Sequence, residues 1–231
     1  MSGLDWNQLN KAVVAVMNLN HSIRERYILV GGASLVCLGS TRVTSDIDLL
    51  FPYGSSAHLN PLPTRSPSVT RRGGKLYAMA GETEFPVDIL ETVIGDKTFE
   101  DLEPFTIPIL GGIRTLDFPI ALGIKIRSFF LRNDEVEAGC KKADSDIYDI
   151  IWITESIKGQ GRMIDDVVAK AIPVGCYNML LVKQRLGDTG ALSDFLSIGG
   201  QKFQVPWEED TDDQREYYGM MKMIHEEEGD L

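Results

Sequence analysis

The chain has few cysteines and few histidines, and neither residue type has the spacing of a metal site. The 231 residues include three cysteines, which stand far apart at Cys37, Cys140 and Cys176. An odd number of widely spaced cysteines supplies neither a disulfide framework nor a CxxC metal knuckle. We therefore expect buried free thiols in a reducing compartment. The three histidines share no ligand spacing, so we assign them no metal.

Long apolar runs are also missing. The richest stretch, residues 12–17, is six residues long, whereas a membrane span needs about 18. The first residues carry neither a basic region nor a cleavable apolar segment, so we expect no secretory signal. These absences predict a cytoplasmic protein with no membrane partner. The sequence also contains no Walker loop, nucleophile elbow or dinucleotide fingerprint.

Positive charge is scarce, and the excess of negative charge is local. The formal net charge is -11, of which residues 208–231 carry -8 through ten acids and two bases. The other 207 residues carry -3 and are therefore close to neutral. A near-neutral body offers no global basic field to attract nucleic acid. We expect the acidic tail to be a solvated, partly disordered end.

The composition that remains is that of a folded globular protein. Apolar residues make up 43% and charged residues 25%, which excludes a disordered chain, a collagen-like fibre and a coiled coil. Residue patterns predict an α/β arrangement first and helices afterwards, that is, a mixed sheet with flanking helices followed by a helical C-terminal lobe. The expected domains are an α/β core at 1–115, a helical lobe at 116–206 and an acidic tail at 207–231.

The pattern of apolar residues places the individual elements. Apolar spacing predicts an amphipathic helix over 5–19, a short helix over 33–38 and strands over 27–30 and 46–51. A hairpin around Gly81 is expected from strands over 75–79 and 85–91. The Pro-, Ser-, Gly- and Arg-rich stretch 52–74 is predicted to be an exposed loop. Helices are expected at 118–131, 144–157, 163–171 and 177–186.

The stretch from Val30 to Leu49 carries the most chemistry. Gly31 and Gly32 follow the first predicted strand, and a glycine pair there lets backbone N–H groups approach a phosphate. Asp46 and Asp48 are two residues apart in a strand, so their carboxylates lie on one face. Such a pair holds one or two divalent cations against that phosphate, and hard carboxylate oxygens suit Mg²⁺.

Asp88 is the candidate for a third carboxylate. It lies between Val87 and Ile89 in an otherwise apolar predicted strand. An acid in that position is costly to bury unless it binds a metal, a cation or a hydrogen-bond donor. Asp88 would complete the ligand set and could accept the proton of an attacking hydroxyl.

Together these residues resemble the signature of the polymerase-β-type nucleotidyltransferase superfamily. A hydrophobic residue and the glycine pair are followed, after thirteen residues, by Asp-hydrophobic-Asp-hydrophobic, and Asp88 matches the third element. The stretch from Gly31 to Asp48, with Arg42 and Thr44, is similar to the abortive-infection toxin branch and its minimal relatives. A later helical Lys125, followed by Lys142 with Asp146 and Asp149, extends the resemblance, which covers about residues 27–155.

The resemblance implies a nucleotidyltransferase fold and a Mg²⁺-dependent reaction, with Mn²⁺ as the alternative ion. An acceptor would attack the α-phosphate of a nucleoside triphosphate such as ATP in line and release pyrophosphate. Asp46, Asp48 and Asp88 would hold the metal ions and form the catalytic set. Triphosphate binding would fall to Gly31, Gly32, Ser34, Arg42, Thr44 and Lys125.

Several alternatives stay open at this stage. Arg42 could instead form an ion pair with Asp46, Lys125 could be a solvated lysine, and Asp146 and Asp149 could merely brace their own helix. The basic residues Arg65, Arg71, Arg72 and Lys75 could bind an RNA end or belong to a solvated loop. The acceptor is a small molecule, a protein or an RNA end such as that of a tRNA, and the near-neutral body disfavours RNA. The chain could also be a catalytically degenerate nucleotide-binding or interaction module.

Overall fold

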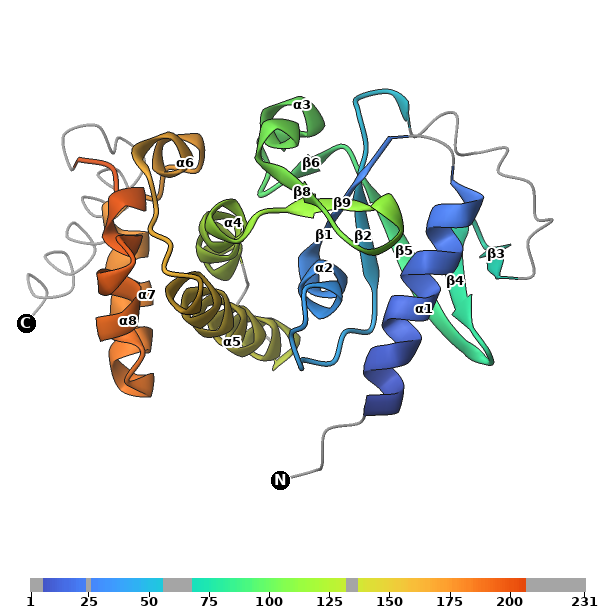
Figure 1. Ribbon diagram of the computed structural model, residues 1–231, viewed down its shortest axis with the longest axis horizontal. Coiled ribbons are helices and arrows are strands. Elements are labelled where there is room, and N and C mark those ends of the chain that lie inside the picture. The colour runs from blue at the N-terminus through green and yellow to red at the C-terminus, as the bar shows by residue number, and fades with distance from the viewer. Residues whose placement is uncertain (1–5, 24–25, 56–67, 132–136, 207–231) are drawn as a thin grey trace, which may run out of the picture. The chain divides into compact units, whose positions relative to one another are not determined.

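The computed structural model describes residues 6–23, 26–55, 68–131 and 137–206. These residues form two compact units, Met1–Asp117 and Phe118–Leu231 (Figure 1). The predicted acidic tail, 207–231, and Arg65 of the predicted basic cluster lie outside the described residues.

The first unit is built on a seven-stranded mixed sheet of order β3-β4-β5-β2-β1-β9-β8. Its strands, in chain order, are β1 Ile28–Val30, β2 Ile47–Leu50, β3 Val69–Arg72, β4 Lys75–Ala80, β5 Thr83–Leu90, β8 Thr106–Pro108 and β9 Arg114–Leu116. β2 runs parallel to β5 and β1 runs parallel to β9, while the other neighbours are antiparallel. A second, two-stranded sheet joins β6 Thr92–Val93 to β7 Lys97–Thr98.

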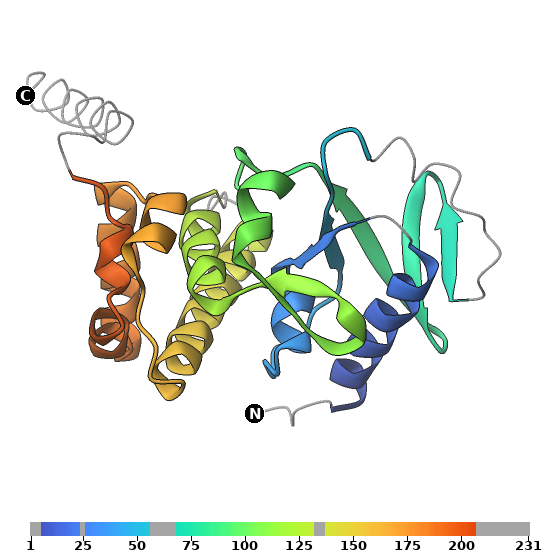
Figure 2. The same ribbon diagram turned by 45° about the horizontal axis from the view of Figure 1, so that its top comes forward.

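Two helices, α1 Trp6–Ser22 and α2 Gly31–Cys37, pack on one face of this sheet. α1 contacts β3, β4, β5 and α2 and lies alongside the strands (Figure 2). Because strand side chains alternate between faces, Ile47 and Leu49 enter this core while Asp48 points to the opposite face. A short helix, α3 Phe99–Leu102, begins with a capping box between Thr98 and Asp101. The chain also has 3₁₀ turns at η2 Glu103–Phe105, η3 Leu110–Gly112 and, in the second unit, η4 Gly200–Phe203.

The second unit is helical. Its helices are α4 Phe118–Phe130, α5 Glu137–Gly159, α6 Asp166–Ala171, α7 Cys176–Thr189 and α8 Leu192–Ser197. α4 packs along α5, and the Phe118 and Trp152 rings meet edge to face with centroids 5.6 Å apart. Within the described part of the chain, no helix combines the length and apolarity that crossing a bilayer requires.

The structure confirms the mixed α/β sheet with flanking helices and the helical region that follows it. The hairpin at Gly81 is confirmed as well, with Gly81 at φ +63° between β4 and β5. The predicted loop over 52–74 is wrong at its end, because Val69–Arg72 forms β3. Gly73 and Gly74 both have positive φ and make the two-residue turn that pairs β3 with β4.

Two smaller corrections concern the start of α2 and the cysteines. The helix expected over 33–38 begins earlier, at Gly31, so the glycine pair forms its first turn. As expected, none of the three cysteines forms a disulfide, but the expectation of buried thiols is wrong, because Cys140 is exposed and Cys37 and Cys176 are only partly buried. Cys140 lies on α5, whereas Cys37 packs against the core of the first unit.

Candidate active site

The backbone at Gly31 lies directly against the carboxylate of Asp48. Gly31 has φ +68°, and a Cβ atom added to it would sit 2.0 Å from Oδ2 of Asp48. An L side chain rarely adopts this φ, and here it would also overlap an oxygen. Only glycine therefore lets the end of β1 and the start of α2 approach the carboxylate that β2 supplies.

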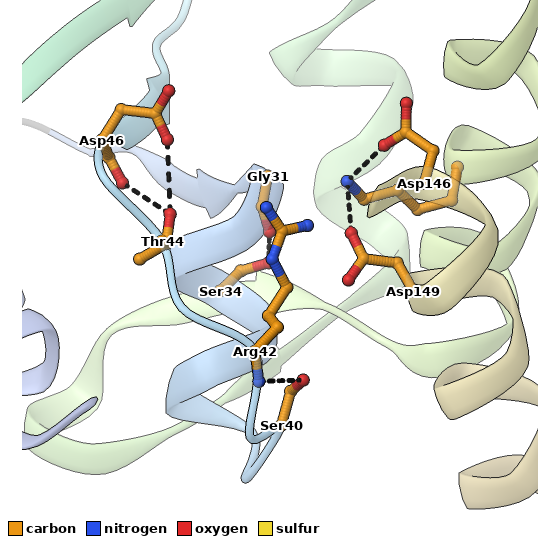
Figure 3. A network of polar contacts seen from close by, with 9 residues as sticks. Gly31, Ser34, Ser40, Arg42, Thr44, Asp46, Asp146 and Asp149 are labelled. Carbon is orange, nitrogen blue, oxygen red and sulfur yellow. Dashed lines mark hydrogen bonds and ion pairs between the residues drawn. The ribbon is translucent and has the colours of Figure 1, made fainter. Parts of the chain in front are cut away.

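Gly32 is enclosed by two further residues of the predicted site. A Cβ atom there would lie 2.9 Å from Oγ1 of Thr44 and 3.0 Å from Nη2 of Arg42. The structure thus brings Arg42 and Thr44 to the same short stretch of backbone that Asp48 contacts. In Figure 3 the Arg42 side chain extends toward Gly31.

Hydrogen bonds within this group fix several of its side chains (Figure 3). The Ser34 hydroxyl donates to the Gly31 carbonyl at 2.7 Å. The Thr44 hydroxyl lies 3.1 Å from the carbonyl oxygen of Asp46 and 3.3 Å from its Oδ1, so its proton is shared between the two. The backbone N–H of Arg42 donates to the Ser40 hydroxyl at 3.3 Å. Thr44 therefore orients Asp46, and Ser34 holds the Gly31 peptide.

Asp48 and Asp88 occupy neighbouring positions of the sheet. They are register partners across the parallel pair of β2 and β5, whose backbones are about 4.8 Å apart. Partners in a parallel pair point to the same face, so the two carboxylates lie side by side. Asp46 is two residues before Asp48, directly ahead of the first residue of β2. The sheet therefore places Asp48 and Asp88 next to each other, while Asp46 lies just before the start of β2.

The environment of Asp88 differs from that of a fully buried acid. Its side chain is 44% exposed, and its Oδ1 lies 3.6 Å from Nζ of Lys75 on β4. The sequence predicted that Asp88 binds a metal, a cation or a hydrogen-bond donor. In the structure its partner is a cation, the Lys75 ammonium. Lys75 is the first residue of β4, which confirms the strand predicted from residue 75, so it does not belong to a solvated loop.

The fit of these residues to a divalent cation rests on two carboxylates. Among the residues described here, no three His, Cys, Asp or Glu side chains are grouped closely enough to hold a metal ion. Mg²⁺ commonly takes only one or two protein carboxylates and completes its octahedron with water and substrate phosphate oxygens. The register pair of Asp48 and Asp88, beside the glycine cradle, offers the hard oxygen donors that such an ion needs.

Lys125 lies in the second unit, where two carboxylates hold it. Its Nζ is 3.0 Å from Oδ1 of Asp146 and 2.8 Å from Oδ2 of Asp149. Lys125 is 8% exposed, Asp146 2% and Asp149 0%. The alternative of a solvated lysine is therefore wrong, and the two aspartates reach from α5 to α4 instead of merely bracing their own helix. Figure 3 shows the two carboxylates converging.

This buried cluster is the feature that sequence reasoning missed. The signal was present, because Asp146 and Asp149 are three residues apart on α5 and hence on one helical face. That face also carries the buried Ile150 and Ile153. An aspartate pair on an apolar face needs a buried cation. The prediction that Lys125 binds a triphosphate remains a prediction.

The basic residues of the β3–β4 hairpin have partners of their own. Arg72 forms an ion pair with Glu84, and its guanidinium lies 4.8 Å from the centre of the Tyr77 ring. Lys75 pairs with Asp88. These charges are thus matched to neighbouring acids on the same sheet, which argues against a simple anion-binding patch at the hairpin.

Comparisons with protein-family models and with curated proteins found no match to this chain. The functional argument therefore rests on the geometry around Gly31, Asp48 and Asp88.

Proposed function

We propose that this chain is a Mg²⁺-dependent nucleotidyltransferase, which transfers a nucleoside monophosphate from a nucleoside triphosphate to an acceptor and releases pyrophosphate. One observation carries the proposal. The Asp48 carboxylate lies against the Gly31 backbone on one side and is the register partner of Asp88 on the other. Phosphate-binding backbone and cation-binding carboxylates are thereby next to each other, as nucleotidyl transfer requires.

The residues around the glycine pair would bind the triphosphate. Backbone N–H groups at Gly31 and Gly32 would approach the β- and γ-phosphates, because neither residue has a side chain of its own. Arg42 adds a positive charge next to Gly32, and Thr44 keeps Asp46 oriented. Ser34 contributes through its bond to the Gly31 carbonyl, which fixes the orientation of that peptide.

Asp46, Asp48 and Asp88 would hold Mg²⁺, with Mn²⁺ as the alternative ion. When bound, the ion supplies positive charge that stabilises the charge developing on the phosphate oxygens. The Asp88 carboxylate is half exposed and accepts the proton of the attacking hydroxyl, which is general-base chemistry. That hydroxyl oxygen forms the new bond to the α-phosphorus, and pyrophosphate leaves.

The acceptor and the compartment form the less specific part of the proposal. Small molecules and protein hydroxyls fit the near-neutral body better than an RNA end does. The described cysteines form no disulfide, which suits a reducing compartment such as the cytoplasm.

Nucleotide binding tests this proposal without knowledge of the acceptor. Thermal unfolding is measured with each of the four ribonucleoside triphosphates, with and without Mg²⁺, for the wild type, Asp48→Asn and Asp88→Asn. We expect one or more triphosphates to raise the melting temperature only with Mg²⁺, and both variants to lose that rise. Asp96→Asn is the control, since Asp96 is an exposed acid of the same unit with a lysine partner. A Mg²⁺-dependent rise that persists in both variants would show that the site is elsewhere.

A second candidate is a catalytically degenerate protein that binds a nucleotide without turning it over. The observation that favours it is that the described residues group no three potential metal ligands. The two candidates differ in pyrophosphate release. Wild-type protein that binds a triphosphate with Mg²⁺, but releases no pyrophosphate with any acceptor from a cell extract, would support the degenerate protein.

A further inference from the structure

Asp88 is placed between a like charge and an opposite charge on the same face of the sheet. On β2 its register partner is Asp48. On the other side, Leu76 of β4 pairs with Val87 of β5, so the preceding residue, Lys75, comes level with Asp88. The Lys75 ammonium lies 3.6 Å from the Asp88 carboxylate. The neighbouring strands β2, β5 and β4 thus carry Asp48, Asp88 and Lys75 side by side on one face of the sheet.

We infer that Lys75 is a tethered counter-ion that competes with the divalent cation for the Asp88 carboxylate. The inference rests on the proposed function, because it concerns the same carboxylates. In the structure the ammonium takes a position on Asp88 that an incoming cation needs. Cation binding then displaces the ammonium from the carboxylate into solvent. Lys75 is thereby a positioning residue, which sets the cation concentration at which Asp88 joins the site.

The contact is suited to exchange. The Lys75 side chain is 60% exposed and that of Asp88 is 44% exposed, and ion pairs with this much solvent are weak. Lysine carries its charge on a flexible four-carbon stem, so the ammonium can leave while the strand stays in place. A buried pair such as that of Lys125 with Asp149 offers no such exchange.

The β3–β4 hairpin fixes the position of the Lys75 backbone. Gly73 and Gly74 form the two-residue turn, and Arg72 and Lys75 are the register pair that flanks it. Arg72 is engaged with Glu84 and the Tyr77 ring. Glu84 is therefore already matched to a cation, and Asp88 is the acid that the structure assigns to Lys75.

Direct measurement of cation binding tests the inference. Mn²⁺ is titrated into the full-length protein and free Mn²⁺ is followed by electron paramagnetic resonance, with and without a non-hydrolysable triphosphate analogue. Lys75→Met removes the charge and keeps the stem, and Lys75→Arg keeps the charge. Lys97→Met is the matched control, because Lys97 is paired with Asp96 at 3.7 Å in the same unit. Both methionine variants remove one positive charge from the chain.

We expect Lys75→Met to lower the dissociation constant for Mn²⁺ by about two- to five-fold, the range set by the strength of an exposed ion pair. Lys75→Arg and Lys97→Met should stay close to the wild type. Equal affinity in Lys75→Met and Lys97→Met would overturn the role of Lys75 and leave the proposed function standing. Wild-type protein that binds no Mn²⁺, even with the triphosphate analogue, would overturn both.

A second measurement follows Lys75 itself in the wild-type protein and uses only the charge-conserving Lys75→Arg, for assignment. Lysines of the wild type are reductively methylated with a ¹³C label, and their resonances are followed as Mg²⁺ is added. The Lys75 resonance is assigned by its disappearance in Lys75→Arg. We expect it to shift with Mg²⁺ while that of Lys97 stays in place. A Lys75 resonance that is insensitive to Mg²⁺, under conditions where Mn²⁺ binds, would overturn the inference.

Discussion

The Asp48 carboxylate occupies the space that a side chain at Gly31 would fill, with Oδ2 only 2.0 Å from the position of a Cβ atom. The two residues are 17 positions apart in the chain and belong to α2 and β2. Their contact joins a stretch of backbone suited to phosphate with a carboxylate suited to a cation. Most of what the proposed function requires of this chain depends on that contact.

Gly31→Ala should therefore destabilise the protein more than an alanine at another glycine with the same backbone conformation. Gly81 is the matched control, because its φ of +63° resembles the +68° of Gly31 and nothing lies within 4 Å of its Cβ position. Gly81→Ala should cost about 1 kcal/mol for the left-handed conformation alone. Gly31→Ala should lose at least twice that in urea unfolding and should also weaken nucleotide binding. Equal losses in the two variants would argue that Asp48 moves aside freely.

Thr44→Val should loosen Asp46 and weaken cation binding. The valine keeps the shape of threonine but removes the hydroxyl that donates to Asp46. A lost hydrogen bond of this kind is worth about 1 kcal/mol, or about a five-fold change in affinity. Mn²⁺ titration measures the effect, and Thr44→Ser, which retains the hydroxyl, should behave like the wild type. Weakened binding in Thr44→Ser would point to lost packing instead.

Lys125→Met should be among the most destabilising single changes in the second unit. It leaves the buried carboxylates of Asp146 and Asp149 without their shared cation, and breaking a buried ion pair from one side costs about 3–5 kcal/mol. Lys158→Met is the control, since Lys158 pairs with Asp194 at the surface and should cost at most about 1 kcal/mol. Urea unfolding compares the two.

The same cluster offers a test of the cause. Adding Asp146→Asn and Asp149→Asn to Lys125→Met removes the charges that were left over. The triple variant should then regain stability relative to Lys125→Met, because the two buried negative charges are gone. A triple variant that is less stable than the single one would show that packing, and not charge, dominates here.

Stability should fall in alkaline solution because of Cys37 and Tyr27. Burial raises the pKa of the Cys37 thiol from 9.0 to about 11. Between these values the unfolded chain releases a proton that the folded chain keeps, so the free energy of unfolding is constant below pH 9 and falls as pH rises towards 11. The loss from this group is at most about 2–3 kcal/mol. Burial, and secondarily Cys37, also raises the pKa of Tyr27, which extends the loss above pH 10.

Urea unfolding between pH 8.5 and 11 measures this effect, with Cys37→Ala as the comparison. The variant should show a shallower fall from pH 9 to 11 than the wild type. Alkylation with iodoacetamide at pH 8 gives an independent measure, since exposed Cys140 should react well before Cys37. Equal alkylation rates would contradict the burial of Cys37.

The parts of the structure that were predictable from the sequence are those determined by local pattern. Alternation around Asp46 and Asp48 predicts a strand, and Gly81 between two apolar runs predicts a hairpin; both are confirmed. β3 was missed because only Val69 of its four residues is buried, which is too little to show alternation. Local pattern also placed Asp48 on the polar face of its strand.

The contacts that define the candidate site are long-range, and local pattern does not contain them. The sequence predicts that the glycine pair at Gly31 follows a strand. It does not show that the Asp48 carboxylate fills the space beside Gly31. The burial of Lys125 depends on residues 21 and 24 positions later, which only the packing of α4 on α5 brings near. Likewise, Lys75 meets Asp88 only because the turn between Ala80 and Thr83 sets the register of β4 with β5.

The strand order of the large sheet also bears on self-association. Its outermost strands are β3 and β8, whose outer backbone groups would be open to a strand from another molecule. β8 has only three residues and ends at Pro108, which has no N–H to donate. β3 has four residues, two of which are arginines. Edge strands that are short, charged or ended by proline resist pairing with the edge of another molecule. We therefore expect the described sheet to resist fibril formation at concentrations at which a sheet with longer, apolar edge strands would form fibrils.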